Sequence, residues 1–257
     1  MLKKIVIKII SLIVPTKILI KIEGIIGGAL GKGVEIGVVN EINNVKKFLK
    51  KDVKIIFDIG ANYGNYTNEL LKYFPSSNYY LFEPGKLPYK HLLNKFKDYP
   101  NIKVYNYAVS NNDSSKNLYY DKKGSGRASL YERRIEHFNI QFDKFEEVKS
   151  IQLNTLFKNE FNDDLFKIDF CKIDVEGHEF AILDSFKNNF KKFKLIQFEF
   201  GGTSIDSRTY FQDFWYLLKD DFDIYRIGPT GPILIKEYTE RDEIMIFMNY
   251  LAVNKKL

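Results

Sequence analysis

The pattern of apolar and polar positions after residue 50 predicts alternating strands and helices. Short β-branched or aromatic runs, bounded by glycine, proline or polar residues, alternate with longer amphipathic stretches. The runs predict strands at 54–58, 78–83, 102–107, 168–174, 194–200, 222–227 and 244–253. The stretches between them predict helices at 63–74, 87–98, 179–190 and 207–219. This order is typical of an α/β fold with a doubly wound, mostly parallel seven-stranded sheet, closed by a C-terminal antiparallel hairpin.

Residues 110–165 break this regular alternation. They contain a further predicted strand at 117–121 and a polar, glycine-containing loop at 124–130. The charged stretch that continues to Lys149 predicts either a solvated helix or an insertion that covers a substrate.

The first 50 residues predict a separate helical segment in front of a catalytic domain at 51–257. Residues 1–30 are rich in Ile and Leu, but charged residues and a proline interrupt them, so no run reaches the ~18–20 apolar residues of a spanning helix. The apolar stretch 9–14 follows two lysines, as in a signal peptide, yet no small-residue cleavage site follows it. We favour a helical cap packed on the domain, which implies a cytoplasmic protein. The alternative is peripheral membrane contact through residues 1–30.

Composition narrows the classes of partner. The formal net charge is +6, but only six of the 39 basic residues are arginine, and no arginine cluster with interleaved aromatics is present. Nucleic acid is therefore an unfavoured partner. The single cysteine, Cys171, excludes an intramolecular disulfide and a multi-cysteine zinc site, and its apolar strand indicates a small buried hydrophobe.

The segment 57–64 (FDIGANYG) carries the first chemical signal. Asp58 ends a predicted buried strand, and Gly60 and Gly64 allow a tight turn into a helix. Glu83 ends the next strand about 20 residues later, where an acid hydrogen-bonds ribose hydroxyls. Asn62 stands between two glycines that are four residues apart.

This spacing favours S-adenosylmethionine over a dinucleotide. A dinucleotide site would need G-x-G-x-x-G, so that a third glycine brings pyrophosphate onto the helix terminus. Asp58 would also repel a pyrophosphate, whereas it suits a sulfonium cofactor with an amino-acid tail. In such folds the adenine is usually contacted at the end of strand three, which here places Ala108 beside it.

A second group of polar residues follows strands four and five. Asp174, Glu176 and His178 come after strand four, and Glu199 lies at the end of strand five. Because the carboxyl ends of parallel strands define the ligand crevice, these side chains are the candidate catalytic residues. A carboxylate or His could remove the proton of an acceptor hydroxyl as it is methylated. Alternatively, Mg²⁺ held by Asp174 and Glu199 could acidify that hydroxyl.

Taken together, the segments 58–64, 83–84, 106–110, 126–130 and 172–179 resemble the FkbM-type methyltransferases over roughly residues 50–250. The resemblance implies a class I, Rossmann-like methyltransferase that transfers a methyl group from S-adenosylmethionine to a hydroxyl of a sugar, glycan or small molecule. It places the family's cofactor contacts on Asp58, Gly60, Asn62, Gly64 and Glu83, and its acids after strand four on Asp174 and Glu176. Family members often have Leu-Asp before strand four, where this chain has Leu153 and Asn154.

Two other functions compete with this interpretation. A nucleic-acid amine methyltransferase usually carries an Asn/Asp-Pro-Pro-aromatic segment after strand four, where this chain reads DVEG at 174–177. Cysteine-dependent base methylation would require a reactive thiol, which a buried Cys171 would not provide. The second competitor is a non-catalytic cofactor-binding partner in a glycan-synthesis complex, against which the intact acids argue.

Overall fold

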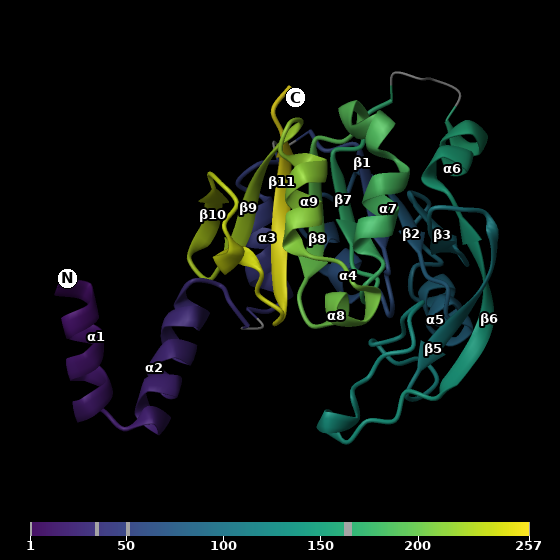
Figure 1. Cartoon of the computed structure of the whole chain (residues 1–257). Coiled ribbons are helices and arrows are strands. Elements are labelled where there is room, and N and C mark those ends of the chain that lie inside the picture. The colour runs from purple at the N-terminus through teal and green to yellow at the C-terminus, as the bar shows by residue number, and fades with distance from the viewer. Residues whose placement is uncertain (1, 34–35, 50–51, 162–165, 257) are drawn as a thin grey trace.

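The computed structural model describes residues 2–33, 36–49, 52–161 and 166–256, and these residues form two sheets (Figure 1). The larger, mixed sheet has eight strands in the order β10-β9-β11-β8-β7-β1-β2-β3. A smaller sheet has three strands in the order β4-β6-β5. The strands are β1 (Ile55–Ile59), β2 (Asn78–Phe82), β3 (Ile102–Tyr105), β4 (Ala108–Val109), β5 (Ser114–Tyr120), β6 (Lys144–Ile151), β7 (Phe170–Ile173), β8 (Leu195–Phe200), β9 (Phe222–Gly228), β10 (Gly231–Ile235) and β11 (Met248–Asn254).

The five parallel strands of the larger sheet end at a common edge. Ile59 of β1 is in register with Phe82 of β2 and with Ile173 of β7, and Ile173 in turn with Phe198 of β8. β11 then runs antiparallel between β8 and β9. The residues that follow β1, β2 and β7 therefore emerge side by side, which is the arrangement that the sequence predicts for a ligand crevice.

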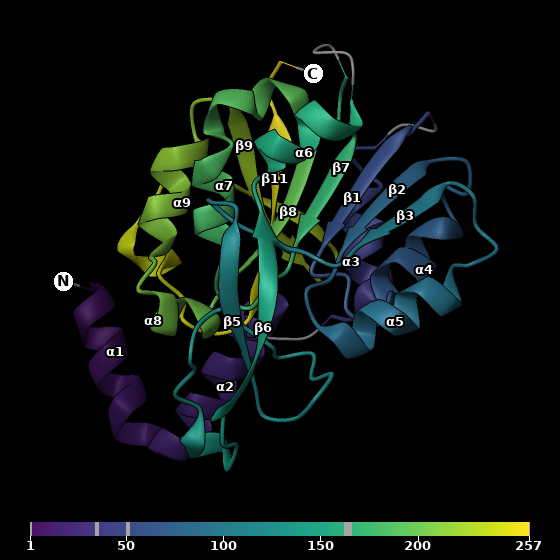
Figure 2. The same ribbon diagram turned by 90° about the vertical axis from the view of Figure 1, so that its right-hand side faces the viewer.

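Helices cover both faces of the larger sheet, with α7 and α9 on one face and α3 and α4 on the other (Figures 1 and 2). The small β4-β6-β5 sheet stands beside this layered body (Figure 2). The helices are α1 (Leu2–Ile13), α2 (Thr16–Ala29), α3 (Val38–Val45), α4 (Asn65–Leu71), α5 (Lys86–Lys95), α6 (Leu153–Glu160), α7 (Glu179–Ser185), α8 (Thr203–Ser207) and α9 (Phe211–Leu218).

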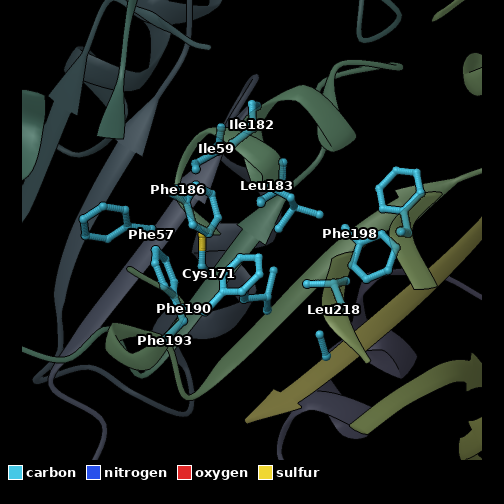
Figure 3. Packing of buried hydrophobic residues seen from close by; sticks show 14 of the residues in the cluster. Phe57, Ile59, Cys171, Ile182, Leu183, Phe186, Phe190, Phe193, Phe198 and Leu218 are labelled. Atoms are coloured by element: carbon cyan, nitrogen blue, oxygen red, sulfur yellow. The ribbon is translucent and has the colours of Figure 1, made fainter. Parts of the chain in front are cut away.

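Alternating strand residues supply a core on each face of the sheet. Phe57 and Ile59 of β1 pack towards α7, whereas Ile56 packs towards α3 and α4. Cys171 lies among the phenylalanines of the α7 face, fully buried, and burial raises the pKa of its thiol (Figure 3). The expectation that Cys171 is a small buried hydrophobe is therefore confirmed.

The predicted fold class is confirmed, with three differences in detail. The sheet has eight strands rather than seven, because β10 adds an edge strand to β9. The two predicted closing strands, β9 and β11, do pair antiparallel, but β11 lies between β8 and β9, and β9 forms a further hairpin with β10. The charged stretch that continues to Lys149 contains a short 3-10 helix, Glu136–Phe138, and then strand β6, which pairs antiparallel with β5 at residues 144–150, so it is not one solvated helix. The polar residues of β6 alternate with buried ones such as Val148, a period that favours a strand.

The N-terminal helices differ from the expected packed cap. Every described residue of α1 is exposed, and in α2 Gly28 is the one that is buried. α3 behaves differently, because Ile42 and Val45 are fully buried in the core beside α4. Residues up to 29 thus add almost nothing to the core, although they are helical as expected.

Candidate active site

Two adjoining cavities lie at the common edge of the parallel strands. One is a wide cleft of about 810 Å³, and the other is a narrow slot of about 50 Å³. The residues that line both are Gly60, Asn62, Gly126, Asp174 and Glu176. The turn after β1 and the turn after β7 thus form the junction between the two cavities.

Packing, rather than ligand approach, requires the glycines of the first turn. Gly60 has φ +83°, and a Cβ there would lie 1.8 Å from the backbone oxygen of Asp174. Gly64 has φ +69° before α4, and a Cβ there would meet the side chains of Leu92 and Phe96. These two positions let β1, β7 and α5 approach closely.

Glu83 connects this turn to the slot. One of its carboxylate oxygens accepts a hydrogen bond from the Asn62 amide at 2.8 Å, and the other accepts from the Gly85 amide at 2.8 Å. Burial raises the pKa of Glu83 to about 7, although both amide bonds act in the opposite direction. Ala108 and Val109 line the same slot, so its walls combine a carboxylate with apolar surface.

Asp58 lies beneath the cavities and is missing from the described residues that line them. It is fully buried, and one oxygen accepts a 2.6 Å hydrogen bond from the Thr67 hydroxyl. Burial raises its pKa, while the nearby Lys172 lowers it. Its other oxygen, Oδ1, has no hydrogen-bond partner in the part of the chain that the structure describes. Asp58 therefore braces the turn and retains one unused acceptor atom.

Asp174 is held at the junction by a lysine that sequence reasoning did not single out. The Lys172 ammonium lies 2.7 Å from an Asp174 carboxylate oxygen and 4.9 Å from the centre of the Tyr66 ring. Burial alone would lower the pKa of Lys172, but the neighbouring Asp174 and Asp58 carboxylates raise it overall. Lys172 therefore stays charged and fixes the orientation of Asp174.

Glu176 lies at the same junction in an unusual backbone conformation. Its φ is +57°, and an oxygen of its side chain lies 2.6 Å from an Arg133 guanidinium nitrogen. Burial raises the pKa of Glu176 to about 7, and Asp174 adds to this, whereas Arg133 lowers it. Arg133 comes from the irregular segment between β5 and β6, which explains why the sequence did not reveal it.

The wide cleft continues to Glu199 and to the N-terminal segment. Glu199 faces it from β8, and burial together with Asp174 raises its pKa well above the ordinary value. Glu41 of α3 also lines the cleft and accepts a 2.7 Å hydrogen bond from Gln197. No sequence signal pointed to Glu41, because α3 lies in a segment without a recognisable motif.

His178 does not share this site, since it is missing from the described linings of both cavities. One ring nitrogen lies 2.9 Å from the Ser110 hydroxyl, and the other lies 3.1 Å from the Tyr131 hydroxyl. Burial lowers the pKa of His178 to about 4, with a smaller contribution from Lys116. The geometry gives His178 a structural role, joining the turn after β7 to the segment that carries Arg133.

This role predicts a pH-dependent contribution to stability. The folded-state pKa of His178 lies below its ordinary value, so its contribution is present above pH 6.5 and is lost as pH falls towards 4. Urea unfolding should show the wild type more stable than His178→Asn at pH 7.5. The gap should narrow by about 3 kcal/mol at pH 4.5, at about 1.4 kcal/mol per pKa unit. A gap that stays constant would show that His178 does not titrate as described.

The expected magnesium ligands do not form a recognisable metal cluster. Within residues 2–33, 36–49, 52–161 and 166–256, no group of three or more His, Cys, Asp or Glu side chains is arranged to hold a metal ion. Asp174 is paired with Lys172, whose ammonium contacts one of its two carboxylate oxygens. Asn154 lies in α6, where its side-chain oxygen accepts a hydrogen bond from Asn189.

Comparison with protein families decides the assignment. Residues 58–223 match the model of the methyltransferase FkbM domain, which is more than half of the chain. The chain belongs to the FkbM methyltransferase family. The family uses S-adenosylmethionine, so this is the cofactor that its members imply for the site. A search of curated sequences finds no match.

Solved structures with similar folds include other methyltransferases. FkbM methyltransferase from Methylobacillus flagellatus KT is 15% identical with a TM-score of 0.48, and the match covers 79% of this chain but 44% of that one. The chain thus spans less than half the length of that relative. A precorrin-6y C5,15-methyltransferase from Geobacter metallireducens is 13% identical with a TM-score of 0.42, covering 84% and 88%. M. capricolum TrmK in complex with S-adenosyl-homocysteine is 13% identical with a TM-score of 0.43, covering 84% and 68%.

The residues at the junction fit S-adenosylmethionine chemically. Glu83 offers a buried carboxylate to a ribose, and the apolar residues 107–109 offer a surface to an adenine. Asp174 lines both cavities and supplies a carboxylate for an ammonium or a sulfonium group, whereas Asp58, expected as a cofactor contact, lies buried behind the turn. Gly60, Asn62 and Gly64 shape the turn that carries these groups.

Proposed function

We propose that this domain transfers a methyl group from S-adenosylmethionine to a hydroxyl of a sugar, glycan or other small polar acceptor. The cofactor would occupy the slot, with Glu83 at the ribose, and the acceptor would occupy the wide cleft. The observation that carries the proposal is the junction of the two cavities at Asp174 and Glu176. When bound, the cofactor supplies an electrophilic methyl group for in-line transfer.

Glu176 is the residue best suited to remove the proton of the acceptor hydroxyl. A hydroxyl is a weak nucleophile unless its proton leaves as the new bond forms, and a base is most effective when its pKa is near the working pH. Burial brings the pKa of Glu176 to about 7. Arg133 holds Oε2, so Oε1 would take the proton while the acceptor oxygen gains the methyl group.

The other acids would bind the acceptor rather than deprotonate it. Burial raises the pKa of Glu199 well above its ordinary value, which favours the protonated form that can donate a hydrogen bond to a hydroxyl. Asp174 can accept one. The lining of the cleft contains Glu41, Asp174, Glu176 and Glu199 beside two cations, Lys172 and Arg127. This excess of acids disfavours a polyphosphate such as RNA and suits a neutral polyol.

The screen that tests this proposal uses donor carrying an isotopically labelled methyl group. Wild-type protein is incubated with the donor and with separate pools of neutral oligosaccharides, small-molecule alcohols and RNA, with and without Mg²⁺. We expect label in a hydroxyl-bearing neutral pool, and a requirement for Mg²⁺ would favour metal assistance through Asp174 and Glu199. Label that enters RNA alone would replace this proposal with the nucleic-acid alternative.

Loss of the Glu83 carboxylate should abolish most of the cofactor affinity. Glu83→Ala removes a charged hydrogen-bond acceptor, and such bonds are worth about 1.5–3 kcal/mol, which corresponds to roughly 10–150-fold in affinity. Calorimetric titration of S-adenosylhomocysteine into the wild type and the variant measures this. Glu237→Ala, at an exposed site, is the matched control. Equal affinities for wild type and Glu83→Ala would remove Glu83 from the cofactor site.

A further inference from the structure

The two N-terminal helices expose a large apolar surface. Leu2 and Leu12 are each 76% exposed, and Ile13 and Ile25 are each 73% exposed. Figure 1 shows α1 and α2 standing apart from the sheet. Val14 and Pro15 join the two helices. Water-facing surface of this kind marks an interaction site rather than a folded core.

Each helix has an apolar side and a basic side. In α1, Ile5, Ile9 and Ile13 recur every four residues and share one side, whereas Lys4 and Lys8 share the other. No acidic residue occurs in α1. This pattern is that of a helix that lies in the plane of a membrane surface.

α2 also has an apolar side and a basic side, and it contains one acidic residue. Ile18, Ile22 and Ile26 form its apolar side, and Lys17 and Lys21 lie away from them. Glu23 is the single acidic residue of the sequence up to residue 30, against five lysines. The excess of positive charge beside the apolar surface is complementary to anionic lipid headgroups. No described helix is long and apolar enough to cross a bilayer.

We propose that α1 and α2 form an in-plane anchor that binds the domain to an anionic membrane surface. Their apolar sides would enter the boundary between headgroups and acyl chains, and their lysines would contact the headgroups. We prefer a membrane surface to a second copy of the chain as the partner of these helices, because two copies would bring the lysines of both chains together.

The anchor is attached to the rim of the wide cleft. The Arg226 guanidinium donates to the Leu30 carbonyl at 3.5 Å, and the Gly33 amide donates to the Phe247 carbonyl at 3.1 Å. Gly33 and Phe247 both line that cleft. This step rests on the proposed function, in which the wide cleft holds the acceptor. An acceptor presented at the membrane surface would then reach the cleft most directly.

Vesicle sedimentation of the full chain tests the anchor without any need for activity. Wild type should sediment with vesicles that contain phosphatidylglycerol, far more than with pure phosphatidylcholine, and binding should fall as salt rises. Lys4→Glu/Lys8→Glu should weaken binding by about 25-fold or more, at roughly fivefold per lysine near an anionic surface. Ile5→Glu/Ile9→Glu should abolish binding.

Matched controls keep the test decisive. Lys90→Glu/Lys97→Glu removes the same charge from an exposed surface elsewhere and should retain most of the binding. Because α1 contributes no described residue to the core, its variants should keep the wild-type unfolding transition. Equal sedimentation of wild type and Ile5→Glu/Ile9→Glu would overturn the anchor. Equal binding to both kinds of vesicle would also overturn it. A wild-type dimer that forms with rising concentration, and that Ile5→Glu/Ile9→Glu dissociates, would overturn it in favour of a second copy of the chain.

Discussion

Glu176→Gln is expected to lower the turnover of methyl transfer by about 10²–10⁴-fold, the usual contribution of a positioned general base. The amide keeps the size of the side chain and a hydrogen bond from Arg133, but it cannot accept the proton of the acceptor hydroxyl. Affinity for S-adenosylhomocysteine should change only a few-fold. Initial rates on the labelled acceptor, with calorimetric binding in parallel, measure both effects.

The pH profile of turnover distinguishes a general base from a residue that only positions the acceptor. Since the base is active when deprotonated and its pKa is about 7, wild-type turnover should rise from pH 6 to pH 8 and then level off. The residual activity of Glu176→Gln should lose that inflection. Glu237→Gln, at an exposed site, should retain the wild-type rate and profile. A Glu176→Gln variant with unchanged turnover would remove Glu176 from the reaction.

Gly60→Ala is expected to destabilise the fold by about 3–5 kcal/mol, from backbone strain combined with overpacking. The reason is that a Cβ at φ +83° would lie 1.8 Å from the Asp174 carbonyl oxygen, and that atom belongs to the backbone of the turn after β7. Neither turn can move without disturbing the junction of the cavities. Urea-induced unfolding measures the change in free energy.

Gly24→Ala supplies the matched control for this substitution. Gly24 lies within α2, and a Cβ there meets nothing within 4 Å. Alanine is favoured over glycine in an exposed helix by about 1 kcal/mol or less, so this variant should be neutral or slightly stabilised. If Gly60→Ala unfolded at the wild-type urea concentration, the close approach of the turns after β1 and β7 would be wrong.

The parts of the fold that could be predicted are those with local signals. The buried run before Asp58 and the glycines after it define a strand and a tight turn within ten residues. Once several such strands are parallel, their carboxyl ends must share an edge, which brings Glu83, Asp174 and Glu199 together. Edge strand β10 was missed because its short run follows β9 after a two-residue turn.

The missing parts of the site depend on packing between distant segments. Arg133 reaches Glu176 from an irregular loop, and Glu41 reaches the cleft from α3, so neither spacing nor periodicity could reveal them. For His178 the sequence predicted a site residue that the structure does not place at the site. Its position beside Asp174 and Glu176 in sequence made it a candidate, yet its ring is buried between Ser110 and Tyr131.

The N-terminal helices show why amphipathicity alone cannot name a partner. An apolar side predicts that something covers it, but the same pattern suits a packed cap and a membrane surface. The structure shows α1 exposed throughout its described length, so α1 does not pack as a cap, whereas α3 does. Only then does the excess of lysine over Glu23 favour an anionic lipid surface.

The most direct measurement of the central claim is a crystal structure of the chain with S-adenosylhomocysteine. We expect adenosine in the slot, with its ribose at Glu83, and the sulfur at the junction beside Asp174 and Glu176, facing an open wide cleft. The loop of residues 124–130 should shift to widen the slot. A sulfur atom directed away from the cleft, or a ligand that leaves Glu83 uncontacted, would contradict the account.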